Sequence, residues 1–342
     1  MTYHVTCNTD NNYAQHCCAM LCSLFENNKE MDFHVHVLTH GLTEENTSFL
    51  HSLCERYNNK LTTYEVDEMK LEGVKFRKNR PLTKAAYYRI LLPEIIDESI
   101  DKILYLDCDI IVLGNVKEIY NIELQDYAIA ACPDASPYSD LHRRQLGFDL
   151  KDIAFCSGLM MINLDYWREK DAEEKLLEYS KREREVVYLH DQDSLNYVFK
   201  NQWYVLPYKW GVAPLSIAII DKKQKAFDIN EYVNSPKILH YASNIKPWFD
   251  VWTPQRFFYI KYLKLSNLEK TNMTHVGIKI RTNAWINNIR YMLNRYFRPF
   301  IPNIIEIIVC DIINIIKVIY TLFIKPKQLS KLTFDLWLKK YE

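Results

Sequence analysis

Short apolar runs alternate with longer segments of helical periodicity over most of this chain, and this alternation restricts its fold more than any other feature. Runs rich in branched and aromatic residues predict strands, and the segments between them predict helices. We expect strands near residues 3–8, 33–38, 61–66, 102–107, 127–132, 158–163 and 237–241. We expect helices near residues 12–27, 43–58, 83–92, 165–181, 190–200 and 252–264. Such alternation favours an α/β fold with a mostly parallel sheet covered by helices on both faces.

Two carboxylates follow the predicted strand that begins at Lys102. The strand ends in Asp107-Cys108-Asp109, and because strand side chains alternate between faces, Asp107 and Asp109 point the same way. Ligands bind at the carboxyl edge of an open α/β sheet, where paired carboxylates can hold a hard divalent cation and, through it, a diphosphate. The alternative is that two surface aspartates simply end a strand.

The glycine pattern argues against two common phosphate-binding sites. The 342 residues include only seven glycines, and neither the G-x-G-x-x-G fingerprint nor the G-x-x-x-x-G-K-[ST] loop occurs. With 48% hydrophobic residues, the chain can nevertheless bury a sizeable core. We therefore expect phosphates to be bound through a metal ion and lysine.

Six separated blocks carry a resemblance to a known family. They are Thr9–Ala14, Ala86–Arg89, Tyr105–Val112, Phe155–Leu164, Asp191–Asn196 and the pair Leu239–Tyr241 with Lys246–Trp248. In this order they resemble the family 8 retaining glycosyltransferases, in particular the bacterial lipopolysaccharide galactosyl- and glucosyltransferases. The resemblance implies a GT-A fold, a Rossmann-like mixed and mostly parallel sheet flanked by helices, over residues 1–270. It also implies UDP-galactose or UDP-glucose as the donor.

The same resemblance implies a metal centre. Asp107 and Asp109 would be ligands together with His240, and Cys108 belongs to the same donor-binding segment. Mixed oxygen and nitrogen ligation suits Mn²⁺, with Mg²⁺ as the alternative. A histidine at the end of a strand can also be purely structural.

Further positions are assigned to the nucleotide by resemblance. Asp10 and Asn12 would hold the uracil and ribose, although helix capping would look the same in the sequence. Arg89 would reach the donor, the alternative being an ordinary surface ion pair. Lys246 would reach the diphosphate as a flexible positive charge.

The resemblance also implies the sugar-binding and catalytic positions. Asp191 would bind donor hydroxyls and Gln192 would lie near the reacting anomeric carbon. Glutamine is a poor nucleophile, which favours a same-face transfer over a two-step displacement, and both routes stay open. The other substrate positions are Asp134 on the acceptor side and the pair Cys156 and Ser157, where Cys156 replaces the asparagine that relatives often carry.

The C-terminal region, residues 271–342, differs in charge from the rest of the chain. From residue 277 onward there are eleven lysines and arginines against four acidic residues, a net charge of +7, and the neutral chain therefore carries −7 elsewhere. Apolar residues recur here at helical spacing, among them Trp285 and Ile289, and arginines lie beside them. This pattern is typical of an interfacial amphipathic helix. Charged residues interrupt the apolar segment 304–324, which favours monotopic attachment to an anionic membrane over a spanning helix. An oligomer interface is the alternative.

The nine cysteines form no C-x-x-C pair, which suits a reducing compartment, and no signal peptide is recognisable. We therefore expect a cytoplasmic protein, peripheral at the inner face of the cytoplasmic membrane. The expected function is metal-dependent transfer of a hexose from a UDP-sugar to a lipopolysaccharide or other lipid-linked glycan. Transfer to protein, or to itself, and a catalytically idle nucleotide-sugar or glycan-binding module are the alternatives. We expect no nucleic acid among its partners.

Overall fold

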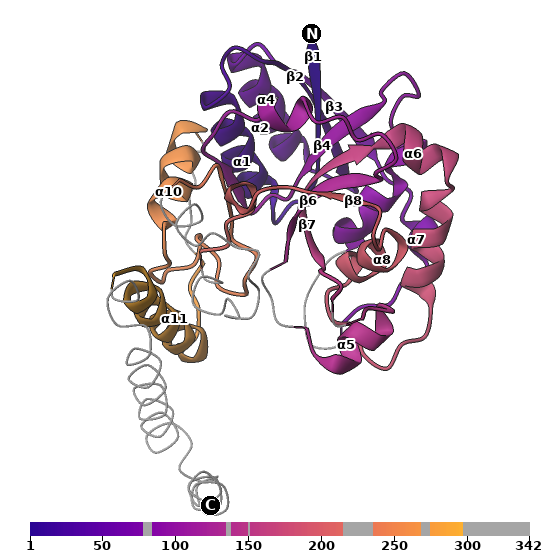
Figure 1. The fold of residues 1–342 in the computed structure, drawn as a ribbon. Coiled ribbons are helices and arrows are strands. Elements are labelled where there is room, and N and C mark those ends of the chain that lie inside the picture. The colour runs from indigo at the N-terminus through magenta and orange to yellow at the C-terminus, as the bar shows by residue number, and fades with distance from the viewer. Residues whose placement is uncertain (78–83, 135–137, 150, 215–234, 268–273, 297–342) are drawn as a thin grey trace, which may run out of the picture. The chain divides into compact units, whose positions relative to one another are not determined.

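The structure is a computed structural model that describes residues 1–77, 84–134, 138–149, 151–214, 235–267 and 274–296 (Figure 1). The chain divides into two compact units, Met1–Val276 and Gly277–Glu342.

A seven-stranded sheet forms the centre of the first unit, with the strand order β3-β2-β1-β4-β7-β6-β8 (Figure 1). Its strands are β1 (Thr2–Asn8), β2 (Asp32–Thr39), β3 (Lys60–Glu65), β4 (Lys102–Leu106), β6 (Ile129–Pro133), β7 (Phe155–Asn163) and β8 (Trp203–Val205). Strand β7 runs antiparallel to both β4 and β6, and the other neighbouring pairs are parallel. The predicted mixed, mostly parallel α/β sheet is confirmed.

Helices cover both faces of the sheet. On one face lie α1 (Ala14–Glu26), α2 (Glu44–Arg56) and α10 (Arg256–Leu265); on the other lie η2 (Lys84–Leu91), α3 (Leu92–Ile95), α6 (Leu164–Glu169), α7 (Ala172–Lys181) and α8 (Asp191–Val198). The remaining helical elements of the described first unit are η1 (Glu68–Leu71), α4 (Lys117–Tyr120), α5 (Asp140–Gln145) and η3 (Tyr208–Trp210).

One hydrophobic core lies between the sheet and the second group of helices. Ile103 and Tyr105 of β4 are fully buried there against Tyr87, Trp167 and Phe199. Burying a large apolar side chain contributes roughly 1.5–3 kcal/mol. This packing holds β4, and therefore the aspartates that follow it, in a fixed position.

Two short strands were absent from the sequence prediction, and one of them builds the site. Strand β5 (Ile110–Val112) follows the aspartates directly and pairs antiparallel with β9 (Ile238–His240). The other missed strand is β8 at the edge of the main sheet. Three residues are too few to show an alternating pattern in a sequence.

Two predicted helices differ from those observed. The segment predicted at 83–92 is mostly a 3₁₀ helix, η2, and Pro93 in the first turn of α3 starts a new helix. The helix predicted at 165–181 is divided into α6 and α7 at Asp171, whose φ is +50°. Aspartate adopts this left-handed conformation more readily than most residues, so the break is compatible with the sequence.

In the second unit, the described residues form one helix, α11 (Ile278–Tyr296). Its helical spacing was expected, and Ile278 and Trp285 expose 58% and 53% of their surface. Among the residues described here, no helix is long and apolar enough to cross a membrane. The apolar segment 304–324 lies outside the described residues.

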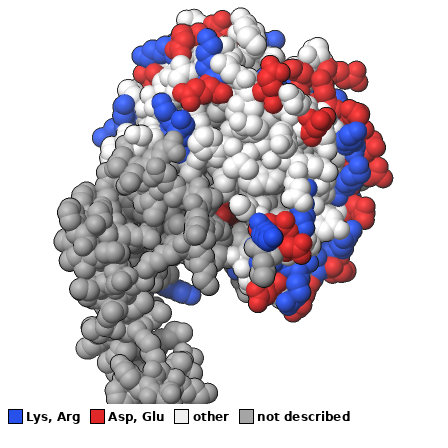
Figure 2. All heavy atoms as spheres, in the orientation of Figure 1, with Lys and Arg blue, Asp and Glu red and all other residues white. Residues whose placement is uncertain are grey.

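The charged surface of the first unit is mixed in sign. On the face drawn in Figure 2, lysines and arginines lie among aspartates and glutamates around an uncharged area. The acidic excess of this unit therefore does not collect into one patch on that face.

Candidate active site

The pairing of β5 with β9 brings the two aspartates to His240. Ile110 is opposite His240 in this pairing, and the Tyr241 amide donates to the Asp109 carbonyl at 2.9 Å. The His240 Nε2 atom lies 3.1 Å from Asp109 Oδ1 and 3.6 Å from Asp107 Oδ2. One ligand atom from each of the three residues lies within 4.8 Å of the others. The structure thus unites the three predicted metal ligands.

Gly158 of β7 makes room for the His240 ring. A Cβ atom at this position would lie 2.1 Å from His240 Cε1, which is an impossible contact. The Gly158 carbonyl also accepts a hydrogen bond of 2.8 Å from the Asp107 amide. Sequence reasoning missed this role, although a glycine inside a strand is a known sign of close approach.

Positive charge surrounds the buried carboxylate of Asp109. Lys246 Nζ lies 2.6 Å from Asp109 Oδ2 and also donates to the Tyr241 carbonyl at 2.9 Å. Burial alone would raise the pKa of Asp109, but Lys246 and His240 lower it well below its usual value. Burial would lower the pKa of His240, but Asp109 raises it above its usual value. Asp109 is therefore ionised at neutral pH.

Arg89 links the aspartate pair to the predicted sugar-binding residues. It is 4% exposed, so the alternative of a surface ion pair is wrong. Its guanidinium lies 2.7 Å from Asp107 Oδ1 and 3.2 Å from Asp191 Oδ2, and donates to the Ser157 carbonyl at 2.6 Å. Burial would lower the pKa of Arg89, but Asp107 and Asp191 raise it above its usual value.

Tyr105 is a further residue that the sequence reasoning missed. Its hydroxyl donates to Asp107 Oδ1 at 2.7 Å, and the Arg89 guanidinium carbon lies 3.9 Å from the centre of its ring. The ring therefore holds Arg89 while the hydroxyl holds Asp107. A tyrosine in an otherwise aliphatic strand directly before the aspartates was the available signal.

Asp191, the first residue of α8, is buried beside Arg89. Burial raises the pKa of Asp191 to about 6, even though Arg89 opposes this shift. Burial thus favours the protonated form of this carboxyl group, and Arg89 favours the ionised form.

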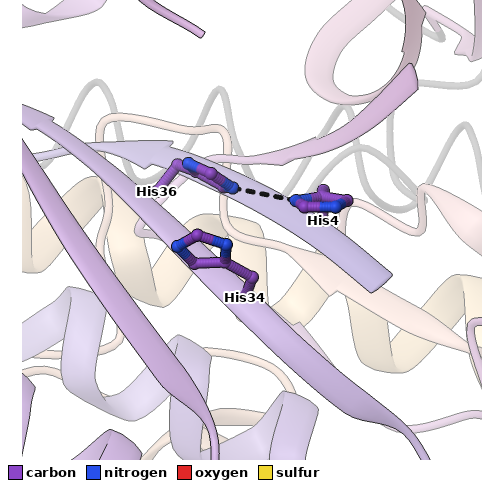
Figure 3. Close-up of side chains that lie close together, drawn as sticks. All are labelled: His4, His34 and His36. Atoms are coloured by element: carbon purple, nitrogen blue, oxygen red, sulfur yellow. Dashed lines mark hydrogen bonds between the residues drawn. The ribbon is translucent and has the colours of Figure 1, made fainter. Parts of the chain in front are cut away.

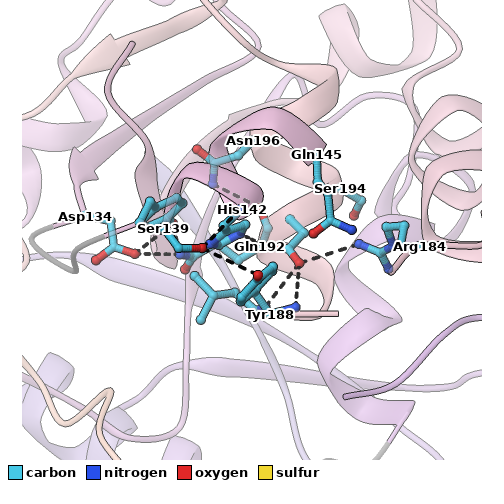
Figure 4. A network of polar contacts seen from close by, with 12 residues as sticks. Asp134, Ser139, His142, Gln145, Arg184, Tyr188, Gln192, Ser194 and Asn196 are labelled. Atoms are coloured by element: carbon cyan, nitrogen blue, oxygen red, sulfur yellow. Dashed lines mark hydrogen bonds and ion pairs between the residues drawn. The ribbon is translucent and has the colours of Figure 1, made fainter. Parts of the chain in front are cut away.

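Gln192 is held by hydrogen bonds at both ends of its amide (Figure 4). Its oxygen accepts from the Ser157 amide at 3.0 Å, and its nitrogen donates to Asp134 Oδ2 at 2.8 Å and to the Tyr138 hydroxyl at 3.0 Å. Tyr138 in turn donates to Asp134 Oδ2 at 3.0 Å. Tyr138 was not among the predicted residues, whereas Gln192, Ser157 and Asp134 were.

Asn196 joins this part of α8 to the sheet. Its side-chain oxygen accepts from the Phe155 amide and its nitrogen donates to the Phe155 carbonyl, both at 2.9 Å. These paired bonds fix the position of α8 relative to β7, and with it Asp191 and Gln192.

The remaining predicted residues lie around this centre. Asp10 Oδ1 accepts from the amides of Asn12 and Tyr13 at 2.9 and 3.0 Å, so Asp10 caps the turn that enters α1, and Asn12 is exposed. Cys108 is buried and its thiol donates to the Asn8 carbonyl at 3.1 Å. Cys156 Sγ lies 3.5 Å from His240 Nδ1.

The donor atoms fit a hard divalent cation. Two carboxylates and one imidazole are the mixed oxygen and nitrogen ligands that Mn²⁺ accepts and Mg²⁺ tolerates. Asp109 Oδ1 is buried without a well-aligned hydrogen-bond donor among the described residues, and it faces His240. A buried carboxylate oxygen of this kind is a natural metal ligand.

The chain resembles known proteins in sequence and in fold. Residues 4–251 match the profile of glycosyl transferase family 8. General stress protein A of Bacillus subtilis (strain 168) is 29% identical over 282 residues, which are 78% of this chain and 95% of that protein. A lipopolysaccharide 1,2-glucosyltransferase of Escherichia coli is 27% identical over 253 residues, 73% of this chain and 74% of that protein.

A solved structure supports the fold. The galactosyltransferase LgtC, crystallised in complex with donor and acceptor sugar analogs, superimposes with a TM-score of 0.69 and 22% identity, covering 81% of this chain and 99% of that chain. The GT-A fold is thereby confirmed. With the family profile matched over most of its length, the chain belongs to glycosyl transferase family 8.

Proposed function

We propose that this protein is a metal-dependent retaining glycosyltransferase that moves galactose or glucose from a UDP-sugar to a lipopolysaccharide or other lipid-linked glycan. The observation that carries the proposal is the convergence of Asp107, Asp109 and His240 beside the Arg89–Asp191 pair. A charged diphosphate needs a group that binds a metal ion, and a polar sugar needs fixed hydrogen-bonding groups beside it.

The metal ion in this proposal is Mn²⁺, with Mg²⁺ as the alternative. Asp107, Asp109 and His240 would hold it. When bound, it neutralises the negative charge that develops on the departing diphosphate. Lys246, 2.6 Å from Asp109, supplies a second positive charge at the same place.

Arg89 and Asp191 would bind and orient the sugar. The buried Arg89 fixes the Asp191 carboxylate, which then has one defined direction in which to accept hydrogen bonds from sugar hydroxyls. Asp10 and Asn12 would hold the uridine, and the capping role of Asp10 is compatible with this contact because only Oδ1 is used for capping.

Gln192 supports the same-face route of transfer. Its amide is held by Ser157, Asp134 and Tyr138, and an amide is too weak a nucleophile to form a covalent intermediate. In the same-face route, the bond between the anomeric carbon and the diphosphate oxygen breaks while the acceptor oxygen bonds to the same face. The proton of the acceptor hydroxyl passes to the leaving diphosphate oxygen. Gln192 would contribute its dipole near the anomeric carbon, with Asp134, Cys156 and Ser157 around the sugars.

The acceptor class rests on two observations. One relative acts, by its name, as a lipopolysaccharide glucosyltransferase, and the region from residue 277 onward carries a charge of +7. A basic region with an amphipathic helix suits an anionic membrane in which a lipid-linked glycan is embedded. We therefore place the enzyme at the inner face of the cytoplasmic membrane.

A donor screen tests the proposal. Purified protein with Mn²⁺ is offered a panel of UDP-sugars and a lipid-linked glycan acceptor, and release of UDP is measured together with the anomeric configuration of the product. We expect turnover with UDP-galactose or UDP-glucose and retention of configuration. UDP binding without turnover of any sugar would instead identify a binding module, and an inverted product would exclude the retaining mechanism.

A further inference from the structure

A cluster of three histidines lies on the sheet outside the candidate active site (Figure 3). His4 belongs to β1, and His34 and His36 belong to β2. His4 is opposite His34 in the parallel pairing, and the alternation of β2 places His36 on the same face as His34. The ring centres of His34 and His36 are 4.1 Å apart, and those of His4 and His36 are 5.3 Å apart.

The ring nitrogens are close enough to share one ion. His4 Nδ1 and His36 Nε2 are 3.0 Å apart, and one nitrogen from each of the three rings lies within 4.8 Å of the others. In a tetrahedral site with bonds of 2.0–2.1 Å, two ligand nitrogens are about 3.3 Å apart. Small rotations of the side chains therefore suffice to reach this geometry.

The neighbouring strand β3 orients two of the rings. The Tyr64 hydroxyl lies 3.0 Å from His36 Nδ1, and the Thr62 hydroxyl lies 2.8 Å from His34 Nε2. The second nitrogen of His34 is Nδ1, and that of His36 is Nε2, which an ion would share with His4 Nδ1 in place of their present hydrogen bond. Metal-binding histidines are usually held in this way, with one nitrogen on the metal and the other hydrogen-bonded to the protein.

The rings are also in the protonation state that metals require. Burial lowers the pKa of His34 to about 4 and that of His36 to about 3, so both are neutral at neutral pH. Burial lowers the pKa of His4 too, although Asp101 opposes the shift. Neutral imidazole nitrogens have a free electron pair for coordination.

Along β1, the histidine cluster is distant from the edge of the sheet where the candidate active site lies. The predicted nucleotide contacts begin beyond Asn8, the last residue of β1. Asn8 lies four residue steps along the strand from His4, which is roughly 13 Å. An ion at the histidines is therefore a second site and not part of the first.

We propose that His4, His34 and His36 bind a late first-row divalent ion such as Zn²⁺, with water at the remaining position. Three neutral imidazoles without a carboxylate ligand suit Zn²⁺, Ni²⁺ or Cu²⁺ and are poor ligands for Mg²⁺. The two sites thus differ in chemistry, oxygen-rich at Asp107 and Asp109 and nitrogen-only here. Such an ion would link β1 to β2, and it would stabilise the sheet without touching the donor.

Zn²⁺ binding by the untagged, full-length protein tests this. Equilibrium dialysis against Zn²⁺ is performed on the wild type, His4→Gln, His34→Gln and the control His51→Gln, so that any ion bound by Asp107, Asp109 and His240 is common to all four proteins. His51 lies on α2, outside the cluster. We expect the wild type and His51→Gln to bind one Zn²⁺ ion at the cluster with the same affinity. Each cluster variant should bind this ion at least about tenfold more weakly. Equal binding by all four proteins would overturn the proposal.

A second measurement needs no variant and so does not depend on folding of a mutant. Wild-type protein is treated with diethyl pyrocarbonate with and without Zn²⁺, and modified histidines are located by mass spectrometry of peptides. We expect Zn²⁺ to protect His4 and His34 and to leave His51 unchanged. If Zn²⁺ protects neither His4 nor His34, these rings do not bind it. Neither measurement uses transferase activity, so the outcome is independent of the proposed function.

Discussion

At the scale of single residues, Asp107 and Asp109 have different surroundings despite being one residue apart. Asp107 is held by Arg89 and Tyr105, whereas Asp109 is held by His240 and Lys246. Asp109 is also the more buried, with 11% of its side chain exposed against 27% for Asp107. Removing the charge of Asp109 should therefore leave His240 and Lys246 without their counter-charge.

We expect Asp109→Asn to lower metal-dependent UDP release at least about a hundredfold. The substitution keeps the volume but removes a charge from the metal centre, where several kcal/mol of transition-state stabilisation are at stake. Steady-state assays over a range of Mn²⁺ concentrations measure the effect. The matched control is Asp126→Asn, an exposed aspartate outside the site. Undiminished turnover of Asp109→Asn would remove this residue from the metal site.

The buried Asp191 should make stability depend on pH. Its pKa is about 6 in the folded protein against 3.8 as the ordinary value, so the folded state holds the proton more tightly. The stabilisation is complete below pH 4 and is lost as the pH rises through 6, by up to about 3 kcal/mol. Urea unfolding of wild type and Asp191→Asn at pH 4 to 7 checks this. If the difference in unfolding free energy between wild type and Asp191→Asn does not change with pH, the prediction is contradicted.

At the scale of elements, the short pair of strands β5 and β9 completes the site. β5 follows the aspartates and β9 ends in His240, so their pairing sets the distance between imidazole and carboxylates. Strand β7 lies beside β4 and leaves space for the imidazole only because residue 158 is glycine. The geometry of the site therefore depends on backbone packing as well as on its charged groups.

Gly158→Ala should displace the His240 ring and weaken metal-supported UDP binding about as much as His240→Ala does. A Cβ atom at 2.1 Å from the ring cannot be accommodated without movement of the ring or of β7. Calorimetric titration with UDP and Mn²⁺ measures the loss. Gly277→Ala is the control, because that glycine has open space around it. Unchanged affinity in Gly158→Ala would show that the ring is not a ligand.

At the scale of the whole molecule, charge differs between the two units. The region from residue 277 onward carries +7 and the rest of the chain −7. Each basic residue near an anionic surface contributes about 1 kcal/mol, and the attraction falls with salt. The charge asymmetry therefore favours a membrane surface as the partner of the C-terminal region.

Removal of residues 277–342 should release the protein from anionic vesicles and leave transfer to a small soluble acceptor intact. The unit Met1–Val276 contains all the candidate site residues. Co-sedimentation with vesicles that contain phosphatidylserine, at low and high salt, compares the full chain with the truncated one. If the full chain ignores the vesicles and truncation instead dissociates a dimer, the region mediates oligomerisation.

The local sequence was sufficient for the fold class and for the position of the aspartates. Hydrophobic periodicity depends on neighbouring residues, and it predicted seven of the strands and the covering helices. The expectation that strand alternation orients Asp107 and Asp109 was wrong, because β4 ends at Leu106 and Asp109 lies in the turn before β5. The separated sequence blocks predicted the family, which the profile match confirms, and the roles that they imply for His240, Arg89, Gln192 and Asp134 stay predictions. Periodicity did not predict the break in the helix at 165–181 or the 3₁₀ form of η2, because packing decides both.

Only the tertiary structure decided how these residues meet. The pairing of β5 with β9, the space at Gly158 and the burial of Arg89 between Asp107 and Asp191 join segments far apart in the sequence. The same holds for the histidines of β1 and β2, which adjoin because those strands are neighbours in the sheet. Periodicity determines the face on which a side chain lies, whereas strand order and close packing determine which side chains share that face.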